Sequence, residues 1–308
     1  MAKAQSSLNG KFMSITTVIS YCTNDFRFLG KCIEEASRFS DQIIVPVCDH
    51  FFNGTPENRE LLRAGFAKYP HVQFLEFPYS DSLYPSYIRY SPQDREWTAH
   101  WNSLARLLGF YHARSEWILF LDTDEIVDGV RFRESFQAEA FGPYDAIRLA
   151  CYYYVLKPHY RATKIQELSL FVRKNRLEPR FFYQSDERYG MYRYVQGNKE
   201  MGVRGLDQKP LIHHYSWVRP EAEISQKVNS WSHRGDRNWQ NIAQELTRGQ
   251  GLNTLFNAEL GFEEVPDVYF DPLAVEIPAG CGEMHFTNVQ TLSKRDFLRL
   301  ELEWESLM

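Results

Sequence analysis

The sequence contains few cysteines and no long apolar run. Its 308 residues include five scattered cysteines without any CxxC spacing, namely Cys22, Cys32, Cys48, Cys151 and Cys281. Such a set favours reduced thiols in a cytoplasmic protein. No segment has the length and apolar character of a membrane span, and the first ten residues lack the apolar core of a signal peptide. We therefore expect a cytoplasmic protein without stable membrane insertion, with peripheral contact at a membrane surface left open.

Several other functional patterns are also absent. The net charge of -5 is spread along the chain without a basic tail or stripe, which argues against nucleic acid as the main partner. There is no Gly-rich phosphate loop of Walker or dinucleotide type, and no Ser-His-Asp motif of the usual kind. Apolar residues make up 44% of the chain and charged residues 24%, as in ordinary globular proteins. The length suits one large α/β domain or a domain with an appended lobe.

What the chain does contain is a regular alternation of apolar strands and amphipathic helices. Strands are expected at 15–20, 43–48, 72–77 and 117–122, and helices at about 28–39, 55–68 and 92–111. Thr55 and Pro56 suit the N-cap and the first position of the second helix. The resulting βαβαβαβ order predicts an α/β protein with a single doubly wound, mostly parallel, Rossmann-like sheet.

The pattern changes after Asp128. Further strands are expected at 146–155, 168–172 and 211–215, and helices around 221–233 and 242–255. Residues 293–296 read Ser-Lys-Arg-Asp, a capping box that would open a terminal helix. We therefore predict a flexible lead-in at residues 1–12, a sheet domain at 13–219, and a mostly helical C-terminal extension at 220–308.

One apolar strand ends abruptly in carboxylates. Residues 117–121 are large and apolar, and Asp122, Asp124 and Glu125 follow at once. A short apolar run bounded by charge is typical of a strand that is buried on both faces of a sheet. Ligands of open α/β sheets bind beyond the carboxyl ends of such strands. Two carboxylates held there suit a hard divalent cation that bridges the phosphates of a nucleotide.

Residues 14–128 resemble the nucleotide-sugar glycosyltransferases of A-type fold, in particular the family 2-like enzymes. The resemblance implies that the loop after the first strand contacts the nucleotide and that Asp49, after the second strand, receives its base. The residues that it assigns to the nucleotide are Tyr21, Thr23, Asn24, Asp49, Asn102, Arg106, Asp122 and Thr123. It also implies that Asp122 and Asp124 hold Mn²⁺ or Mg²⁺. Two structural alternatives stay open, since Asp49 could simply end a strand in a turn and Arg106 could pair with a surface carboxylate.

A second informative segment, residues 213–220, reads His-His-Tyr-Ser-Trp-Val-Arg-Pro. Adjacent side chains on a strand point to opposite faces, so one of the two histidines can face the site while the other packs. A branch of family 2-like proteins resembles this stretch, with His-Tyr-Gly/Ser-Trp-Val-Arg followed by a helical Lys, here Lys227. That resemblance implies that His214 completes the metal shell, with His213 as second choice. Imidazole is a borderline ligand that suits Mn²⁺.

The same branch carries an acidic residue in an aromatic loop before the His motif. The corresponding region is 183–190, where Asp186 is the first choice and Glu187 the second, with a solvated turn as the structural alternative. Such a carboxylate would accept the proton of the acceptor hydroxyl if the reaction inverts the anomeric centre. Asp207 and Glu125 stay open for this role, and retaining enzymes of this fold need no such base.

These residues together predict a metal-dependent glycosyltransferase. It would move a sugar from a nucleotide diphosphate-sugar, built on UDP, GDP or dTDP, to a hydroxyl of a glycan or lipid-linked saccharide. Residues 13–128 would bind the nucleotide and residues 129–219 the acceptor. One alternative is a nucleotidyltransferase, which usually opens with a Gly-rich loop that residues 21–24 lack. The other is a non-catalytic carbohydrate-binding protein with this fold, which the complete acidic motif disfavours.

Overall fold

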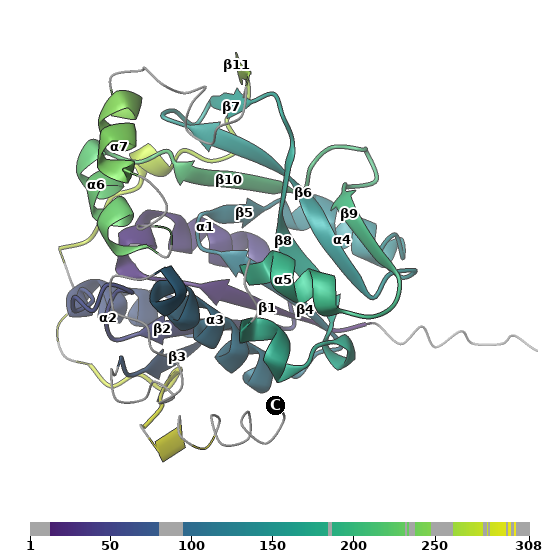
Figure 1. Cartoon of the computed structure of the whole chain (residues 1–308), viewed down its shortest axis with the longest axis horizontal. Coiled ribbons are helices and arrows are strands. Elements are labelled where there is room, and N and C mark those ends of the chain that lie inside the picture. Colours follow the sequence, from purple (N-terminus) through teal and green to yellow (C-terminus); the bar gives the residue numbers. More distant parts are fainter. Residues whose placement is uncertain are drawn as a thin grey trace, which may run out of the picture.

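A large central sheet organises the chain (Figure 1). The computed structural model describes residues 13–79, 95–183, 187–231, 233, 238–247, 261–279, 282, 284–293, 295–296 and 299, with side chains described except at 95–100, 183, 187 and 246–247. The predicted lead-in at residues 1–12 lies outside the described residues.

The strands and helices account for most of the described residues. The strands are β1 (Ile15–Ser20), β2 (Gln42–Cys48), β3 (Gln73–Phe77), β4 (Trp117–Asp122), β5 (Glu125–Val127), β6 (Ala146–Val155), β7 (Tyr160–Ala162), β8 (Gln166–Arg173), β9 (Lys199–Val203), β10 (Ile212–Trp217), β11 (Phe262–Glu264) and β12 (Val289–Thr291). The helices are α1 (Phe26–Ala36), α2 (Arg59–Lys68), α3 (Arg95–His112), α4 (Gly129–Gln137), α5 (Glu187–Tyr194), α6 (Glu221–Ser230) and α7 (Trp239–Thr247), with short 3-10 helices η1 (Thr23–Asp25), η3 (Lys174–Arg176), η4 (Pro179–Tyr183) and η6 (Pro272–Ala274). Among these helices, none combines the length and apolar character that crossing a bilayer requires.

The sheet order is β11-β7-β6-β8-β4-β1-β2-β3-β12, with β5 paired to β10, and both β9 and β10 paired to β6. The first four strands are parallel and lie in the order β3-β2-β1-β4. Among the described strands, β5, β7 and β8 run against the common direction of the rest. The predicted α/β class, with a Rossmann-like and mostly parallel sheet, is therefore confirmed.

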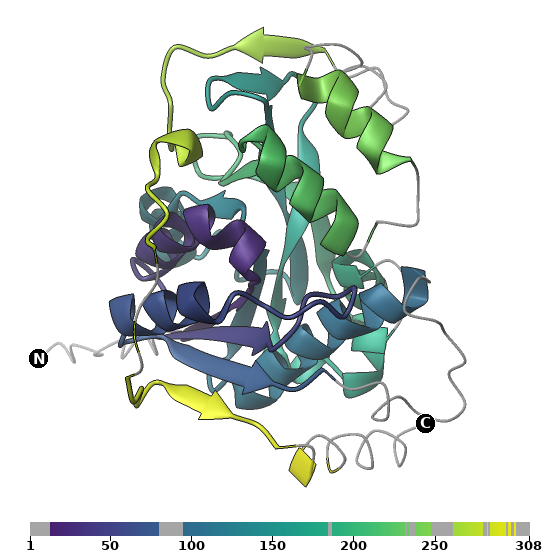
Figure 2. The same cartoon turned by 90° about the vertical axis from the view of Figure 1, so that its left-hand side faces the viewer.

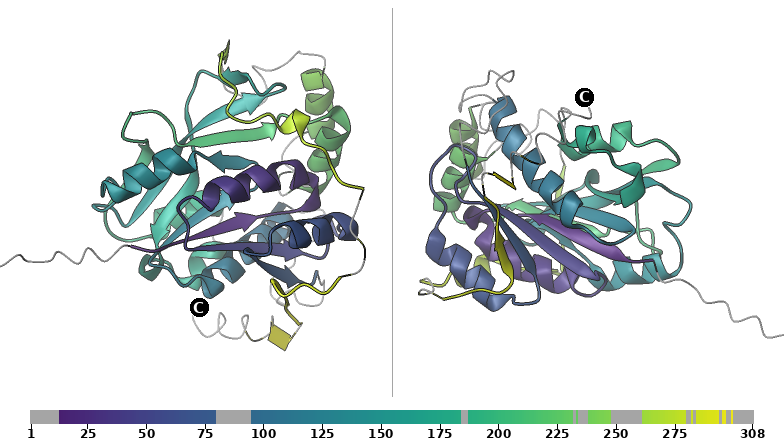
Figure 3. Two further views of the ribbon diagram at one scale, coloured as in Figure 1. Left: turned by 180° about the vertical axis from the view of Figure 1, so that it is seen from behind. Right: turned by 90° about the horizontal axis from the view of Figure 1, so that it is seen from below.

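Helices cover both faces of the sheet, and β4 shows why. Alternate side chains of a strand point to opposite faces, so an uninterrupted apolar strand can feed two cores. Trp117, Leu119 and Leu121 pack in the layer formed with α1, α2 and α4, whereas Ile118 and Phe120 pack in the layer formed with α3 and α5. Figure 3 shows the first set of helices from behind and both layers from below. The doubly wound arrangement follows from this two-sided burial.

The start of α2 differs from the sequence prediction. The helix begins at Arg59, and its N-cap is Asn58, whose side-chain oxygen accepts hydrogen bonds from the amides of Glu60 and Leu61. The predicted cap at Thr55 was wrong, because the Thr55 amide donates instead to the side chain of Asn53 in a turn. An Asn cap that accepts two amides satisfies the helix start better than a lone Thr. Residues 50–57 are thereby left as a loop.

The segment after residue 219 is tied to the rest of the sheet. Helices α6 and α7 pack on β10 and β6 through an apolar cluster that includes Trp217, Ile224 and Trp239. β11 pairs with β7, and β12 pairs with β3 at the far edge, as Figure 2 shows in yellow. The predicted capping box is present, since the Asp296 amide donates to Oγ of Ser293 at 3.3 Å. The division into a nucleotide half, an acceptor half and an extension is functional and stays a prediction.

Candidate functional site

A cavity of about 270 Å³ opens beyond the carboxyl ends of β1, β2 and β4. β1 and β4 are neighbours in register, with Ser20 opposite Asp122, so the loops that follow them meet at one place. The chain runs outward from β1 through β2 and β3, and then returns to β4 on the other side of β1. This reversal of strand order is where open α/β sheets bind ligands. The cavity volume lies near the lower end of the range for small-molecule sites.

Half of the predicted site residues line this cavity. Those that line it are Tyr21, Asn24, Asn102, Asp122, Asp124 and His214. Four others do not line it, but each contacts a residue that does, namely Thr23, Asp49, Arg106 and Thr123. Thr123 is fully buried and donates through both its amide and its hydroxyl to the carbonyl of Ser20, which ties the end of β4 to the end of β1.

The carboxylate that faces the cavity on the β2 side is Glu57. Its Oε2 accepts hydrogen bonds from the amide of Thr23 at 3.1 Å and from the Thr23 hydroxyl. Burial raises the pKa of Glu57 to about 7. Asp49, in contrast, accepts from the amide of Tyr79 at 2.6 Å and pairs with Nδ1 of His50 at 2.8 Å, outside the cavity lining. The sequence did not single out Glu57, because residues 55–68 were expected to be helical.

Asp122 belongs to a network of buried arginines. Its Oδ1 accepts from Nη2 of Arg106 at 2.9 Å, and its Oδ2 accepts from Nη2 of Arg188 at 3.0 Å. Arg188 also donates to both carboxylate oxygens of Glu125. Glu125 accepts further hydrogen bonds from the hydroxyl of Ser169 and the amide of Asp122. Arg106 is therefore paired with the acidic motif itself.

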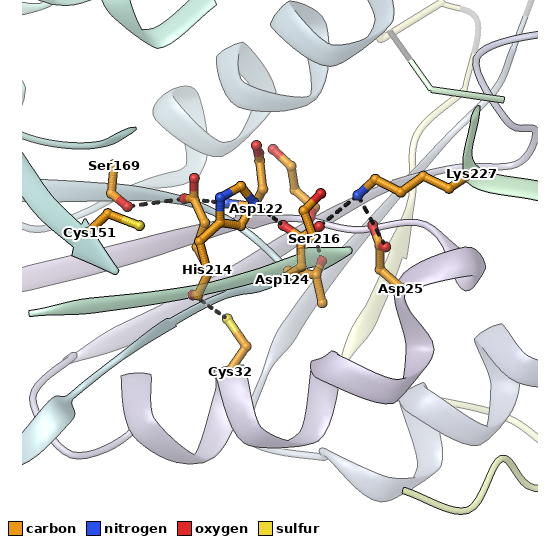
Figure 4. Close-up of polar contacts among 12 residues, drawn as sticks. Asp25, Cys32, Asp122, Asp124, Cys151, Ser169, His214, Ser216 and Lys227 are labelled. Carbon is orange, nitrogen blue, oxygen red and sulfur yellow. Dashed lines mark hydrogen bonds and ion pairs between the residues drawn. The ribbon is translucent and has the colours of Figure 1, made fainter. Parts of the chain in front are cut away.

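Asp124 belongs to a second network, drawn in part in Figure 4. Its Oδ2 lies 2.7 Å from Nζ of Lys227 and 3.2 Å from Nη2 of Arg219, and its Oδ1 lies 3.3 Å from Nε2 of His214. Arg219 also lies 2.7 Å from Oδ1 of Asp25. Burial alone would raise the pKa of Asp124, but the charges of Lys227, His214 and Arg219 outweigh it and hold that pKa well below its usual value.

The last long strand, β10, explains how these distant residues meet. It pairs antiparallel with β5, which places His214 opposite Glu125, and the amide of Tyr215 donates to the carbonyl of Asp124 at 2.9 Å. α6 follows directly and carries Lys227 to the same carboxylate. Arg219 and Lys227 both stand in the quoted His motif, yet sequence reasoning gave them no role at the acidic pair.

The two histidines separate as the alternation along a strand predicts. His214 lines the cavity beside Asp124. His213 is buried on the other face, where its Nδ1 lies 2.9 Å from the Tyr154 hydroxyl and its ring stacks on Tyr269 at 4.1 Å. Burial lowers the pKa of His213 to about 3, so it is neutral at pH 7.

The predicted metal ligands do not fit a divalent ion in this arrangement. Lys227, Arg219 and His214 engage both oxygens of Asp124, and two arginines engage Asp122. Within the described part of the chain, no group of three or more His, Cys, Asp or Glu side chains is placed to hold a metal. A unit positive charge about 4 Å from a divalent ion opposes it by roughly 8 kcal/mol at an effective dielectric constant of about 20. Because the ammonium of Lys227 lies 2.7 Å from Oδ2 of Asp124, an ion bound to that oxygen would meet a repulsion of this kind.

The candidates for the catalytic base are only partly described. Asp186 lies outside the described residues, and Glu187 begins α5 with its side chain outside them. Asp207 pairs with Arg131 in an exposed turn away from the cavity lining. Glu125 lines the cavity, but it is fully buried and held by Arg188, which leaves it poorly suited to accept a proton. Asp186 and Glu187 therefore stay the predicted first and second candidates for the catalytic base.

Several polar atoms of the cavity wall are buried without a hydrogen-bond partner in the described structure. They are Oγ of Ser20, the hydroxyl of Tyr21, Oδ1 of Asn24 and Nδ1 of His214. All four residues line the cavity. Because buried polar groups in folded proteins are normally hydrogen-bonded, these atoms indicate a site built for a polar ligand or for ordered water.

No protein-family model matches this chain, and neither does any curated protein. Among solved structures, the chain is similar to S. aureus TarS 1–349 in complex with UDP-GlcNAc, with a TM-score of 0.42, 10% identity, and coverage of 79% of this chain and 76% of that one. For the same protein in complex with UDP, the TM-score is 0.41 and the identity 8%, with coverage of 79% and 75%. Similarity at this level does not assign a function, so the chemistry of the site has to do so.

Proposed function

We propose that this protein transfers a sugar from a nucleotide diphosphate-sugar to a hydroxyl acceptor. The observation that carries the proposal is the pairing of carboxylates with buried cations at the switch point of the sheet, inside a cavity. Lys227 and Arg188 line this cavity with Asp122 and Asp124. Positive groups held there suit a diphosphate, whose negative charge grows as it leaves.

The β1–β2 side of the cavity suits the nucleoside. Tyr21, Phe51 and Phe52 supply apolar ring surface, and Glu57 together with the unpartnered Tyr21 hydroxyl supplies polar atoms. Ligand sites commonly combine such an apolar lining with a few convergent polar groups. In this proposal the base of UDP, GDP or dTDP lies here, with Glu57 nearer to it than Asp49.

The β10–α6 side of the cavity suits the sugar and the acceptor. His214, Ser216 and Trp231 line it, and an aromatic face beside hydroxyl and imidazole groups suits a sugar ring. In the transfer, the bond between the anomeric carbon and the diphosphate oxygen breaks, and its electron pair stays on that oxygen. The acceptor oxygen forms the new bond and loses its proton to a carboxylate. We assign that carboxylate to Asp186, or else Glu187, which directly precedes the cavity-lining Arg188.

The acceptor in this proposal is a hydroxyl of a glycan or of a lipid-linked saccharide, and the setting is the cytoplasm. The nucleotidyltransferase alternative is disfavoured by the segment after β1, which forms the short helix η1 and contains no glycine. The two activities differ in their products, because glycosyl transfer releases a nucleoside diphosphate and nucleotidyl transfer releases pyrophosphate.

A thermal-shift screen with UDP, GDP, dTDP and their sugars, in EDTA and in Mn²⁺, tests the proposal. A ligand at about 100 times its Kd stabilises the native state by roughly 2.7 kcal/mol, which raises Tm by several degrees in a protein of this size. Asp122→Asn should reduce the shift, whereas Asp207→Asn, an exposed carboxylate outside the cavity, should not. If no nucleotide raises Tm, or if the protein instead joins a nucleoside triphosphate to a sugar 1-phosphate with release of pyrophosphate, the proposal fails.

A further inference from the structure

We propose that Lys227 takes the place of a divalent metal at the acidic motif, so that donor binding and transfer proceed without one. This inference rests on the proposed glycosyl transfer. It follows from the contacts of Asp124, whose two oxygens are both engaged by basic side chains, and from the position of Lys227 on the wall of the cavity.

Lys227 stands where a bridging cation would stand. Its Nζ lies between two carboxylates, 2.7 Å from Oδ2 of Asp124 and 4.0 Å from Oδ1 of Asp25, and Figure 4 shows it reaching between them. All three residues line the cavity. A lysine ammonium is a compact point charge that binds phosphate well. It can therefore contact a diphosphate on one side and the acidic residues on the other.

Among the described residues, the carboxylates and cations joined in ion pairs around the acidic motif are equal in number. Two linked groups of ion pairs contain four carboxylates and four cations, namely Asp25, Asp122, Asp124 and Glu125 with Arg106, Arg188, Arg219 and Lys227. A site with two carboxylates and no such cations reaches neutrality only after it has bound a divalent ion. In this chain the basic side chains supply that charge, and an added metal would have to displace Lys227 against its repulsion.

Arg219 allows Lys227 to turn toward a ligand. Its side chain is fully buried and contacts both Asp124 and Asp25, but it does not line the cavity. Asp124 therefore keeps a counter-ion when the ammonium of Lys227 moves to a phosphate oxygen. Removing a buried charge partner altogether would be costly, so this second cation makes the exchange feasible.

The test measures binding of UDP, GDP and dTDP to the full chain by calorimetry, once in EDTA and once in Mn²⁺. We expect the nucleotide that binds to show a Kd that agrees within about threefold between the two conditions. Lys227→Ala should weaken binding in EDTA by roughly 10- to 100-fold, as expected for the loss of a charged hydrogen bond. Lys31→Ala is the matched control, because Lys31 pairs with the buried Glu35 at 2.7 Å on α1, outside the cavity, and it should bind as wild type does.

Lys227→Met is the second variant. It removes the charge of Lys227 but keeps an unbranched apolar side chain beside Trp231, so it remains informative if Lys227→Ala does not fold. It should weaken binding in EDTA as Lys227→Ala does, and wild-type affinity of this variant in EDTA would overturn the inference. Binding of a nucleotide only in Mn²⁺ would overturn the metal-free inference and leave the proposed function standing. Absence of binding in both conditions would overturn both.

Discussion

Arg188 holds Glu125 through two nitrogens, with Nη2 on Oε1 at 2.8 Å and Nη1 on Oε2, and Glu125 is completely buried. Breaking a buried pair leaves an uncompensated charge, which costs about 3–5 kcal/mol. We therefore expect Glu125→Gln to lower the free energy of unfolding by about 3 kcal/mol, since Asp122 remains as a partner for Arg188. Urea denaturation measures the loss.

The control for this prediction is Glu116→Gln. Glu116 pairs with Arg173 on the surface, where its side chain is 41% exposed. Exposed pairs contribute about 1 kcal/mol or less. Equal losses in the two variants would show that the Arg188–Glu125 pair is no more important for stability than an ordinary surface contact.

Glu57 should make the protein less stable as the pH rises. Its folded pKa of about 7 lies above the ordinary value of 4.5, so between these values the folded state binds more protons than the unfolded state. The contribution of Glu57 is full below pH 4.5 and is lost as the pH rises through 7, by at most about 3 kcal/mol. Glu57→Gln should remove this slope in urea titrations at pH 5 and pH 8. Glu60→Gln, on the exposed side of α2, should retain the wild-type slope.

His213 should act in the opposite direction. Burial lowers its pKa from 6.5 to about 3, so the unfolded chain takes up a proton in this window and the folded protein does not. Stability therefore falls as the pH drops below 6.5, by at most about 5 kcal/mol. His213→Phe keeps a ring against Tyr269 and should flatten the loss between pH 7 and pH 4. His71→Gln changes a surface histidine and serves as the control. If His213→Phe loses as much stability between pH 7 and pH 4 as His71→Gln does, the low pKa of His213 is contradicted.

The parallel half of the fold was predictable because each of its strands is buried on both faces. A short run of apolar residues such as 117–121 predicts a strand that is buried on both faces of the sheet. β1 and β4 have the predicted bounds. The start of α2 was not predictable in the same way. Asn58 and Thr55 are both good caps, and only the turn at Asn53 decides between them.

The acidic motif was located correctly, but its partners were not. Lys227 and Asp124 are 103 residues apart, and their contact depends on the pairing of β10 with β5. No local pattern encodes that register. The resemblance led us to expect a metal ion at Asp124. Which cations neutralise this carboxylate, however, depends on which basic side chains the tertiary fold brings next to it. The same reasoning applies to Glu57, which reaches the cavity only because a loop replaces the first turn of the expected helix.

The catalytic base is the last residue to be assigned, and its neighbours in the chain make the assignment testable. If the reaction inverts, replacing the base should lower kcat by about 10²- to 10⁴-fold while donor binding and Tm stay unchanged. We expect this of Asp186→Asn and, failing that, of Glu187→Gln. Glu178→Gln is the control, because Glu178 is 55% exposed and pairs with Arg180. A fall in only one of the two test variants identifies the base. If neither falls while Asp122→Asn does, the transfer does not use a carboxylate at position 186 or 187, and the anomeric configuration of the product should then be that of the donor.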